Sequence, residues 1–303
     1  MTETTEHPDP PGRTVPVERL KMGDHACMAL RGGEAPWKVF TAYTRTSLAR
    51  SEKVLLVMDP DDLADGDVVS LLDDGGGRVA EAWNSGQLSL KRNTEMYVPD
   101  GRFREDRTID LYTDEVNRAQ SEGWAGLRLT ADMSWAPRVG IDHDRLLDYE
   151  ASVAPLFADP LFTAICWYDR ERFGDRLLDD MGKVHPLRVM ESLDELEVTR
   201  TADGGRIAGS AGLDTRTEFV RALREALSRR DASGPVRHVL DLRALCFMEA
   251  HCAWQLLSLA GSLPTGSEVT VRCGELLGMV LRQLGADEVP QLVIGVEEDE
   301  VTV

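Results

Sequence analysis

The N-terminal two thirds of the chain alternates short apolar runs with amphipathic stretches. The run KVLLVMD over residues 53–59 is continuously apolar, which is typical of a strand buried on both faces of a sheet. The stretch 106–123 begins with Asp and ends with Gly, which predicts a well-formed helix. The same patterns predict strands at 25–30, 86–92, 125–132 and 162–169, and helices at 37–50, 61–72 and 144–158.

This regular alternation predicts an α/β fold with a mainly parallel, doubly wound sheet and helices on both of its faces. A polar, acidic stretch over residues 190–205 separates it from a second α/β pattern. We expect a disordered leader over 1–16, a first domain over 17–189, a linker over 190–195 and a second domain over 196–303. The second domain is predicted to contain strands at 206–212, 236–245, 268–273 and 291–296, with helices at 214–230, from about His251, and at 274–286.

Composition and charge narrow the classes of function. The net charge of −19 over 303 residues argues against direct binding to nucleic acid or to an anionic membrane, because both need an excess of Lys and Arg. No apolar stretch approaches the roughly 20 residues that cross a bilayer. The five cysteines are scattered without the spacing of a disulfide framework. We therefore expect a reduced, cytoplasmic protein.

The first strand-to-helix connection resembles a phosphate-binding loop that has lost its function. Measured against the pattern G-x-x-x-x-G-K-[ST], it keeps Gly32 and Lys38. Trp37 replaces the second glycine and Val39 replaces the hydroxyl residue that binds Mg²⁺. The glycine lets backbone amides close around phosphates and the hydroxyl holds the metal, so ATP hydrolysis loses its physical basis. A chance match is the alternative to a degenerate relic.

Six motifs in the N-terminal region occur in one order and spacing: GDHAC (23–27), SGQLSL (85–90), YVPDGRF (97–103), LRLTADMSW (127–135), LLDYEA (146–151) and CWYDRERF (166–173). Together they resemble the methanogen/methylotroph sensory domain, MEDS, over residues 17–189. The resemblance implies a ligand-sensing relative of KaiC/RecA-type ATPases that has lost its nucleotide loop. It also implies a small organic ligand, and we expect neither a metal nor a cofactor.

A small-molecule pocket is predicted where strand ends carry mixed aromatic and polar side chains. The candidates are Asp24, His25, Trp37, Asp132, Ser134, Trp135, Tyr168, Asp169 and Arg170. The alternative is structural, with Asp24 and His25 as a buried capping pair and the aromatic rings packed in the core. Asp132 stands where an ATPase holds its Mg²⁺-coordinating acid. Cys27 and Cys166 are expected to be small buried apolar residues rather than ligands.

The C-terminal stretch HVLDLRALCFMEAHCAWQLLSLA (238–260) is similar to the signature of STAS domains, the fold of bacterial anti-sigma factor antagonists. The stretch 269–288 adds to this resemblance, which covers residues 196–295. It implies a helix start at which a Ser or Thr is phosphorylated by a partner kinase. Here Glu249 replaces an Asp, and Ala250, His251 and Cys252 supply no hydroxyl. The phosphorylation switch therefore cannot operate, and Glu249 is expected to place a permanent negative charge on the helix amides.

Other chemistries for this segment stay open at the level of sequence. His251 is a candidate phosphohistidine, and Cys252 at a helix start is a candidate redox-active thiol. Metal binding by Cys246, His251, Cys252 and Cys273 lacks the ligand spacing of known zinc sites. We favour a capped helix start on a protein-binding surface.

The expected function is that of a non-enzymatic signalling regulator. Its first domain senses a small ligand, and its second engages an anti-sigma factor (a kinase) or a STAS-domain protein. One alternative is an ATPase-like enzyme that uses Lys38 and Asp132; another is a purely structural subunit of a stress-signalling scaffold. The sequence leaves the ligand, the partner and the oligomeric state open, a homo-oligomer included.

Overall fold

The structure is a computed structural model that describes residues 13–31, 36–59, 63–73, 75–228 and 234–296. The chain divides into two compact units, Met1–Ser192 and Leu193–Val303, and each is described by itself. Both units are α/β, as the alternating patterns predict.

The N-terminal unit is built on a seven-stranded sheet in which every pair of neighbours is parallel. This confirms the predicted parallel sheet. Along the sheet the strands are β1 (Arg13–Val15), β7 (Leu187–Val189), β2 (His25–Leu30), β6 (Phe162–Asp169), β5 (Leu127–Asp132), β3 (Lys53–Val57) and β4 (Leu88–Lys91). All residues of β3, β5 and β6 are buried, which explains their nearly continuous apolar sequences.

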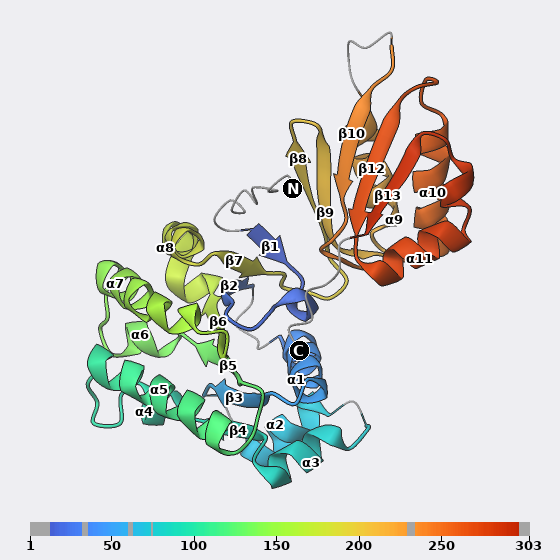
Figure 1. The fold of residues 1–303 in the computed structure, drawn as a ribbon. Coiled ribbons are helices and arrows are strands. Elements are labelled where there is room, and N and C mark those ends of the chain that lie inside the picture. The colour runs from blue at the N-terminus through green and yellow to red at the C-terminus, as the bar shows by residue number, and fades with distance from the viewer. Residues whose placement is uncertain (1–12, 32–35, 60–62, 74, 229–233, 297–303) are drawn as a thin grey trace, which may run out of the picture. The chain divides into compact units, whose positions relative to one another are not determined.

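Helices cover both faces of this sheet (Figure 1). One face carries α1 (Trp37–Ala49), α2 (Asp65–Leu72) and α3 (Arg78–Ser85), and the other carries α5 (Glu105–Ser121), α7 (His143–Val153) and α8 (Arg170–Val184). Shorter helical segments are α4 (Asn93–Met96), α6 (Trp135–Arg138), η1 (Val17–Arg19) and η2 (Ala154–Ala158).

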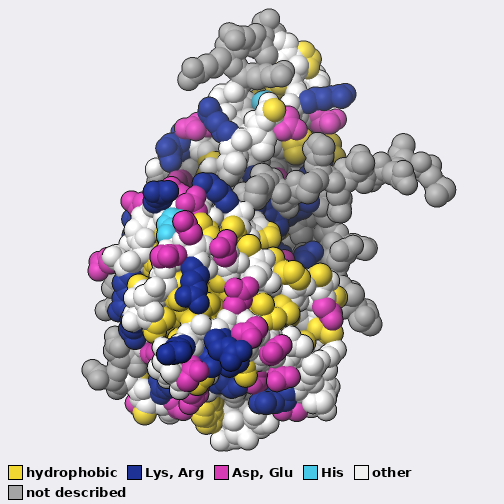
Figure 2. Space-filling model, turned by 90° about the vertical axis from the view of Figure 1, so that its left-hand side faces the viewer, with side chains coloured by type: hydrophobic (Ala, Val, Ile, Leu, Met, Phe, Trp, Pro, Cys, Tyr) yellow, Lys and Arg dark blue, Asp and Glu magenta, His cyan; other side chains and the backbone are white. Residues whose placement is uncertain are grey.

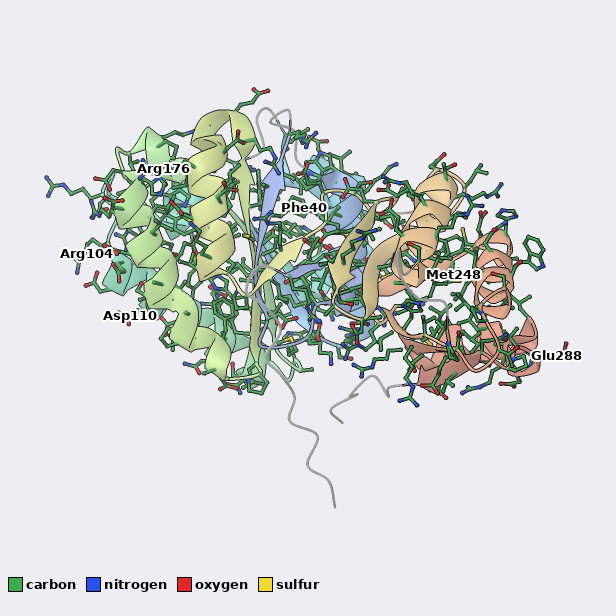
Figure 3. The ribbon with its side chains drawn as sticks, turned by 90° about the horizontal axis from the view of Figure 1, so that it is seen from above. Phe40, Arg104, Asp110, Arg176, Met248 and Glu288 are labelled. Carbon is green, nitrogen blue, oxygen red and sulfur yellow. The ribbon has the colours of Figure 1, made fainter. Side chains whose placement is uncertain are left out.

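The outward sides of these helices are polar. Figure 3 shows Arg104 and Arg176 projecting away from the sheet, whereas Phe40 lies inside and is fully buried. On the face shown in Figure 2, basic and acidic side chains are interspersed, with hydrophobic side chains between them.

The strands β1 and β7 at one end of the sheet, and several helices of this unit, lack a sequence signal. β1 lies at the end of the segment expected to be a disordered leader, where Arg13–Val15 pair with Leu187–Val189 of β7. Each of these strands has three residues, too few for an alternating pattern to appear. The helices α3 and α8 also form where none is predicted. Residues 1–12 of the expected leader lie outside the described part of the chain.

The C-terminal unit contains a mixed sheet with the order β11-β9-β10-β12-β13. A sixth strand, β8, lies off this path and pairs antiparallel with β9. The strands are β8 (Leu196–Thr201), β9 (Gly204–Ala211), β10 (Arg237–Asp241), β11 (Leu245–Met248), β12 (Glu268–Cys273) and β13 (Leu292–Val296). The helices α9 (Arg216–Leu227), α10 (Ala250–Gly261) and α11 (Glu275–Gln283) lie on one face of the sheet (Figure 1), and the 3₁₀ turn η3 spans Ala286–Glu288.

Two details of this unit differ from the prediction. The polar stretch 190–205 contains β8, an antiparallel edge strand whose partly exposed side chains give it no apolar periodicity. The single strand expected over 236–245 ends at Asp241, and a separate strand begins at Leu245 and pairs with β9.

A buried ion pair between Arg128 and Glu52 connects separate strands of the N-terminal sheet. Arg128 on β5 is fully buried, and its guanidinium donates to the carboxylate of Glu52 and, at 3.1 Å, to the carbonyl of Leu20. The guanidinium also lies over the ring of Tyr43, 5.4 Å from its centroid. The pair thereby connects β5 with the residue before β3 and with the segment that precedes β2.

We expect Arg128→Ala to lower the free energy of unfolding of the N-terminal unit by about 3–5 kcal/mol, because it leaves the Glu52 carboxylate buried without a counter-charge. Urea unfolding followed by tryptophan fluorescence measures this effect, since five of the six tryptophans lie in this unit. The double variant Glu52→Gln/Arg128→Met should lose much less. Equal losses in the two variants would contradict the assigned role.

Candidate functional site

A cluster of four metal-ligating side chains is buried between the sheet and helices α7 and α8. The members are His25, Glu150, Cys166 and His185, and one ligand atom of each lies within 4.8 Å of the others. Parallel pairing of Cys27 with Cys166 and of His25 with Ala164 places His25 and Cys166 on one face of β2 and β6. Glu150 reaches them from α7. His185, the residue that directly follows α8, reaches them from the end of that helix.

Glu150 is the centre of the cluster. Its Oε2 atom lies 3.5 Å from His25 Nε2, 3.4 Å from His185 Nε2 and 3.7 Å from Cys166 Sγ. Cys166 Sγ is also 3.6 Å from His25 Nε2. The other carboxylate oxygen of Glu150, Oε1, accepts a hydrogen bond of 2.6 Å from the Tyr168 hydroxyl. The exposed fraction of these side chains is 6% or less, so water does not screen their interactions.

The surrounding structure fixes both imidazole rings. His185 Nδ1 lies 2.9 Å from the Met181 carbonyl, which can only accept, so this nitrogen carries the proton. The Nε2 atom of a neutral His185 ring therefore points a lone pair toward the Glu150 carboxylate, and it has no hydrogen-bond partner among the described residues. The His25 ring stacks on Phe157 with centroids 4.1 Å apart and planes 9° apart.

Burial governs the ionisation of these groups. It lowers the pKa of His25 to about 4, with a further contribution from His185, and it raises the pKa of Cys166 well above its ordinary value. Burial alone would also raise the pKa of Glu150, but the neighbouring imidazoles hold it well below its usual range. The cluster thus contains a carboxylate charge at a site with little solvent.

A small pocket adjoins the cluster along β2, β6 and α8. Its lining residues are Cys27, Met28, Ala29, Tyr168, Arg170, Leu178, Asp179, Met181 and Arg188. Tyr168 and Met181 are shared with the surroundings of the cluster. The cavity volume of ≈20 Å³ is room for about one water molecule, so a ligand held there without rearrangement is very small.

The structure distributes the predicted pocket residues over several places. His25 lies at the amino end of β2 and enters the buried cluster, as does the hydroxyl of Tyr168. Asp24 accepts from the backbone of Lys21 at 2.6 Å. Asp169 caps α8 by accepting from the Glu171 amide.

The other candidates make local contacts. Arg170 pairs with Glu191 at 3.2 Å. Trp37 is partly exposed at the start of α1, Lys38 beside it is exposed, and Gly32 lies outside the described residues.

Asp132 and Trp135 have structural surroundings at the carboxyl end of β5. Asp132 accepts from the Ser134 amide and hydroxyl, both at 2.8 Å, and from the Asn93 amide at 3.0 Å. Burial raises its pKa against these hydrogen bonds. Trp135 is buried and stacks on Tyr97 with centroids 4.5 Å apart, and it also contacts Phe103. The Asp132 carboxylate is thus engaged by Ser134 in its own turn and by the side chain of Asn93.

Glu150 and His185 are not predicted as site residues from the sequence, and Cys166 is expected there only as a small buried apolar residue. Glu150 follows Tyr149 in the motif LLDYEA, where both side chains are buried on the inner side of α7. A charged residue at an inward position of an amphipathic helix is a signal that could have identified it.

The helix start in the C-terminal unit differs from the prediction in one respect. Glu249 is the residue before α10, but its carboxylate forms no hydrogen bond with a described amide of that helix. It instead pairs in bidentate fashion with Arg216 in the first turn of α9, with Nη2 2.9 Å from Oε2. The guanidinium offers two charge-assisted hydrogen bonds, which a single backbone amide cannot match.

The cysteines of this unit do not favour redox or metal chemistry. Cys252 is buried, and its pKa is raised to about 12 by burial and by the neighbouring Glu249 carboxylate. Cys273 is buried on β12, whereas Cys246 is exposed on β11. Over the residues that the structure describes, these cysteines and His251 do not form a group of clustered ligand atoms.

We expect one fast-reacting cysteine, Cys246, when the native chain is treated with a chromogenic disulfide reagent near neutral pH. Cys252 should react at least ~100-fold more slowly, because its thiol is protonated and becomes accessible only on local opening. The variant Cys246→Ser should lose the fast phase. A fast phase that persists there but disappears in Cys252→Ser would restore the redox hypothesis.

Comparison with known proteins gives one family assignment. None of the described helices has the length and apolar character needed to cross a membrane. No curated protein matches the chain. The family model described as "MEthanogen/methylotroph, DcmR Sensory domain" matches residues 24–186, which contain the whole buried cluster and every strand of the N-terminal sheet except β1 and β7. Because this match covers more than half of the 303 residues, the chain belongs to the MEDS family.

Proposed function

We propose that the chain is a non-enzymatic signalling regulator whose N-terminal unit senses a small ligand and whose C-terminal unit engages a protein partner. Membership of a family of sensory domains carries this proposal and supports a signalling role. The pocket beside Tyr168 and Met181 offers the place for the ligand, next to buried groups whose ionisation responds to their surroundings.

Two observations favour sensing over ATP turnover. Lys38 is exposed, and no ion pair or hydrogen bond to a described residue orients it toward a phosphate site. Asp132 already accepts three hydrogen bonds within its own turn and from Asn93, which leaves it poorly placed to hold Mg²⁺. These two observations favour a non-enzymatic function over ATP hydrolysis.

The C-terminal unit supports the second half of the proposal through its exposed apolar side chains. Phe247 is 55% exposed and Trp254 is 58% exposed, on either side of Glu249 in the sequence. Large exposed apolar side chains are typical of protein-binding surfaces. Together with the STAS-like sequence pattern, they favour an anti-sigma factor or a STAS-domain protein as partner.

The sensing function predicts that Ala29→Leu blocks the ligand. Ala29 lines the pocket, which has room for about one water and must widen to admit an organic molecule, and the larger side chain fills this space. Native mass spectrometry of the full chain purified from its own host should show a bound small organic molecule, and Ala29→Leu should lower its occupancy at least ~10-fold. Ala29→Gly, the matched control, should retain it. The absence of an organic adduct in the native chain and in Ala29→Gly would contradict sensing at this pocket.

The partner function predicts that Trp254→Ser and Phe247→Ser each weaken the complex by roughly 30-fold, the effect expected when a central aromatic contact is lost. Calorimetric titration with purified anti-sigma factors and STAS proteins of the same host measures this change. Leu71→Ser, which alters an exposed apolar residue of the N-terminal unit, serves as the control. Unchanged affinity in both aromatic variants, or no complex with any of these proteins, would contradict the assignment.

A further inference from the structure

The cluster of His25, Glu150, Cys166 and His185 brings together four side chains that can each coordinate a metal ion. We propose that these four side chains bind one Zn²⁺ ion, through both Nε2 atoms, Glu150 Oε2 and Cys166 Sγ. This inference goes beyond the proposed function, because such a site would exist whether or not the adjoining pocket binds an organic ligand.

The distances between the four atoms fit a tetrahedral ion. Zinc bonds of about 2.0–2.3 Å in tetrahedral geometry place neighbouring ligand atoms roughly 3.3–3.7 Å apart. Oε2 of Glu150 lies 3.5 and 3.4 Å from the two imidazole nitrogens and 3.7 Å from the sulfur. The sulfur lies 3.6 Å from His25 Nε2. Four of the six edges of the tetrahedron therefore have the length that a central ion requires. The other two edges both involve His185, and they do not exceed the 4.8 Å within which all the ligand atoms lie.

The hydrogen bonds around the cluster orient the ligands as they do in known metal sites. His185 donates from Nδ1 to the Met181 carbonyl, which leaves Nε2 as a lone-pair donor. The Tyr168 hydroxyl engages Oε1 of Glu150, which leaves Oε2 as the single ligand oxygen. His25 lacks such a partner on Nδ1 in the described structure, and stacking on Phe157 holds its ring instead.

The arrangement also presents acceptor atoms to one another. The buried Nε2 of His185 faces a carboxylate oxygen at 3.4 Å. When the ring is neutral, the lone pairs of these two atoms repel unless a proton or a metal cation lies between them. A divalent ion resolves this conflict for all four atoms at once. On binding, the thiol of Cys166 gives its proton to solvent and its sulfur electron pair to the metal, so thiolate and carboxylate together neutralise the ion.

The donor set selects the class of metal. Two imidazoles, one thiolate and one carboxylate suit a borderline-soft ion with four ligands, which is the chemistry of zinc. Mg²⁺ and Ca²⁺ require six or more oxygen ligands, which this cluster does not offer among the described residues. With four protein ligands and full burial, the site would be structural and would join β2, β6, α7 and the end of α8.

Metal analysis of the full-length chain, produced in zinc-supplemented medium and purified without chelator, tests the inference. We expect about one zinc per chain in the native protein, and below roughly one tenth in Cys166→Ser and Glu150→Gln. Cys27→Ser is the matched control, because Cys27 is the buried cross-strand partner of Cys166 but lies outside the cluster. This control should keep its zinc.

Two further measurements guard against loss of zinc through misfolding. Tyr168→Phe keeps all four ligands and should weaken zinc binding about 10–100-fold while the stoichiometry at saturation is unchanged. After zinc is replaced by Co²⁺, the native chain and Cys246→Ser should both show a thiolate-to-cobalt charge-transfer band. A zinc-free native chain, a different resident metal, equal zinc loss in Cys27→Ser and Cys166→Ser, or a cobalt spectrum without the thiolate band would overturn the proposal.

Discussion

The buried carboxylate of Glu150 is the constraint on which the N-terminal unit depends. A carboxylate without solvent is costly unless donors or opposite charges surround it, and here the compensation comes from several elements. Tyr168 and Cys166 approach from β6, His25 from β2, and His185 from the end of α8. Strand register and helix packing are thus coupled to one polar group, because a shift of any of these elements would leave it unpaired.

The fold was more predictable than the site. The central strands have nearly continuous apolar sequences because both faces of the sheet are covered, so β2, β3, β5 and β6 follow from hydrophobicity alone. The strands β1, β7 and β8 do not, since they are short or exposed and long-range pairing defines them. Of the cluster, His25 is predicted as a pocket residue because it begins an apolar strand. Glu150 and Cys166 also lie in motifs but are not predicted as ligands, and His185 is a lone histidine whose partners are remote in the sequence.

The carboxyl edge of the sheet illustrates why strand ends alone are a weak guide to function. Asp132, Ser134 and Trp135 follow a buried strand in a position where many α/β proteins bind ligands. Here the aspartate is saturated by hydrogen bonds and the indole is stacked in the core. His25 and His185 each keep a ring nitrogen without a partner among the described residues, on the face of the sheet that α7 and α8 cover, and only three-dimensional contacts bring them together.

The carboxylates of Glu249 and Glu150 differ in their exposure to solvent. Glu249 is partly exposed, and its pairing with Arg216 is available to water and salt, which suits a fixed charge on a surface. Glu150 is enclosed, so a cation bound in its cluster would change the energy with which β2, β6, α7 and α8 pack together. Met181 joins this cluster to the adjoining pocket, because its carbonyl holds His185 while the residue also lines the cavity. A ligand that displaces α8 at Met181 would alter the cluster, and by linkage a cation in the cluster would alter the affinity for that ligand.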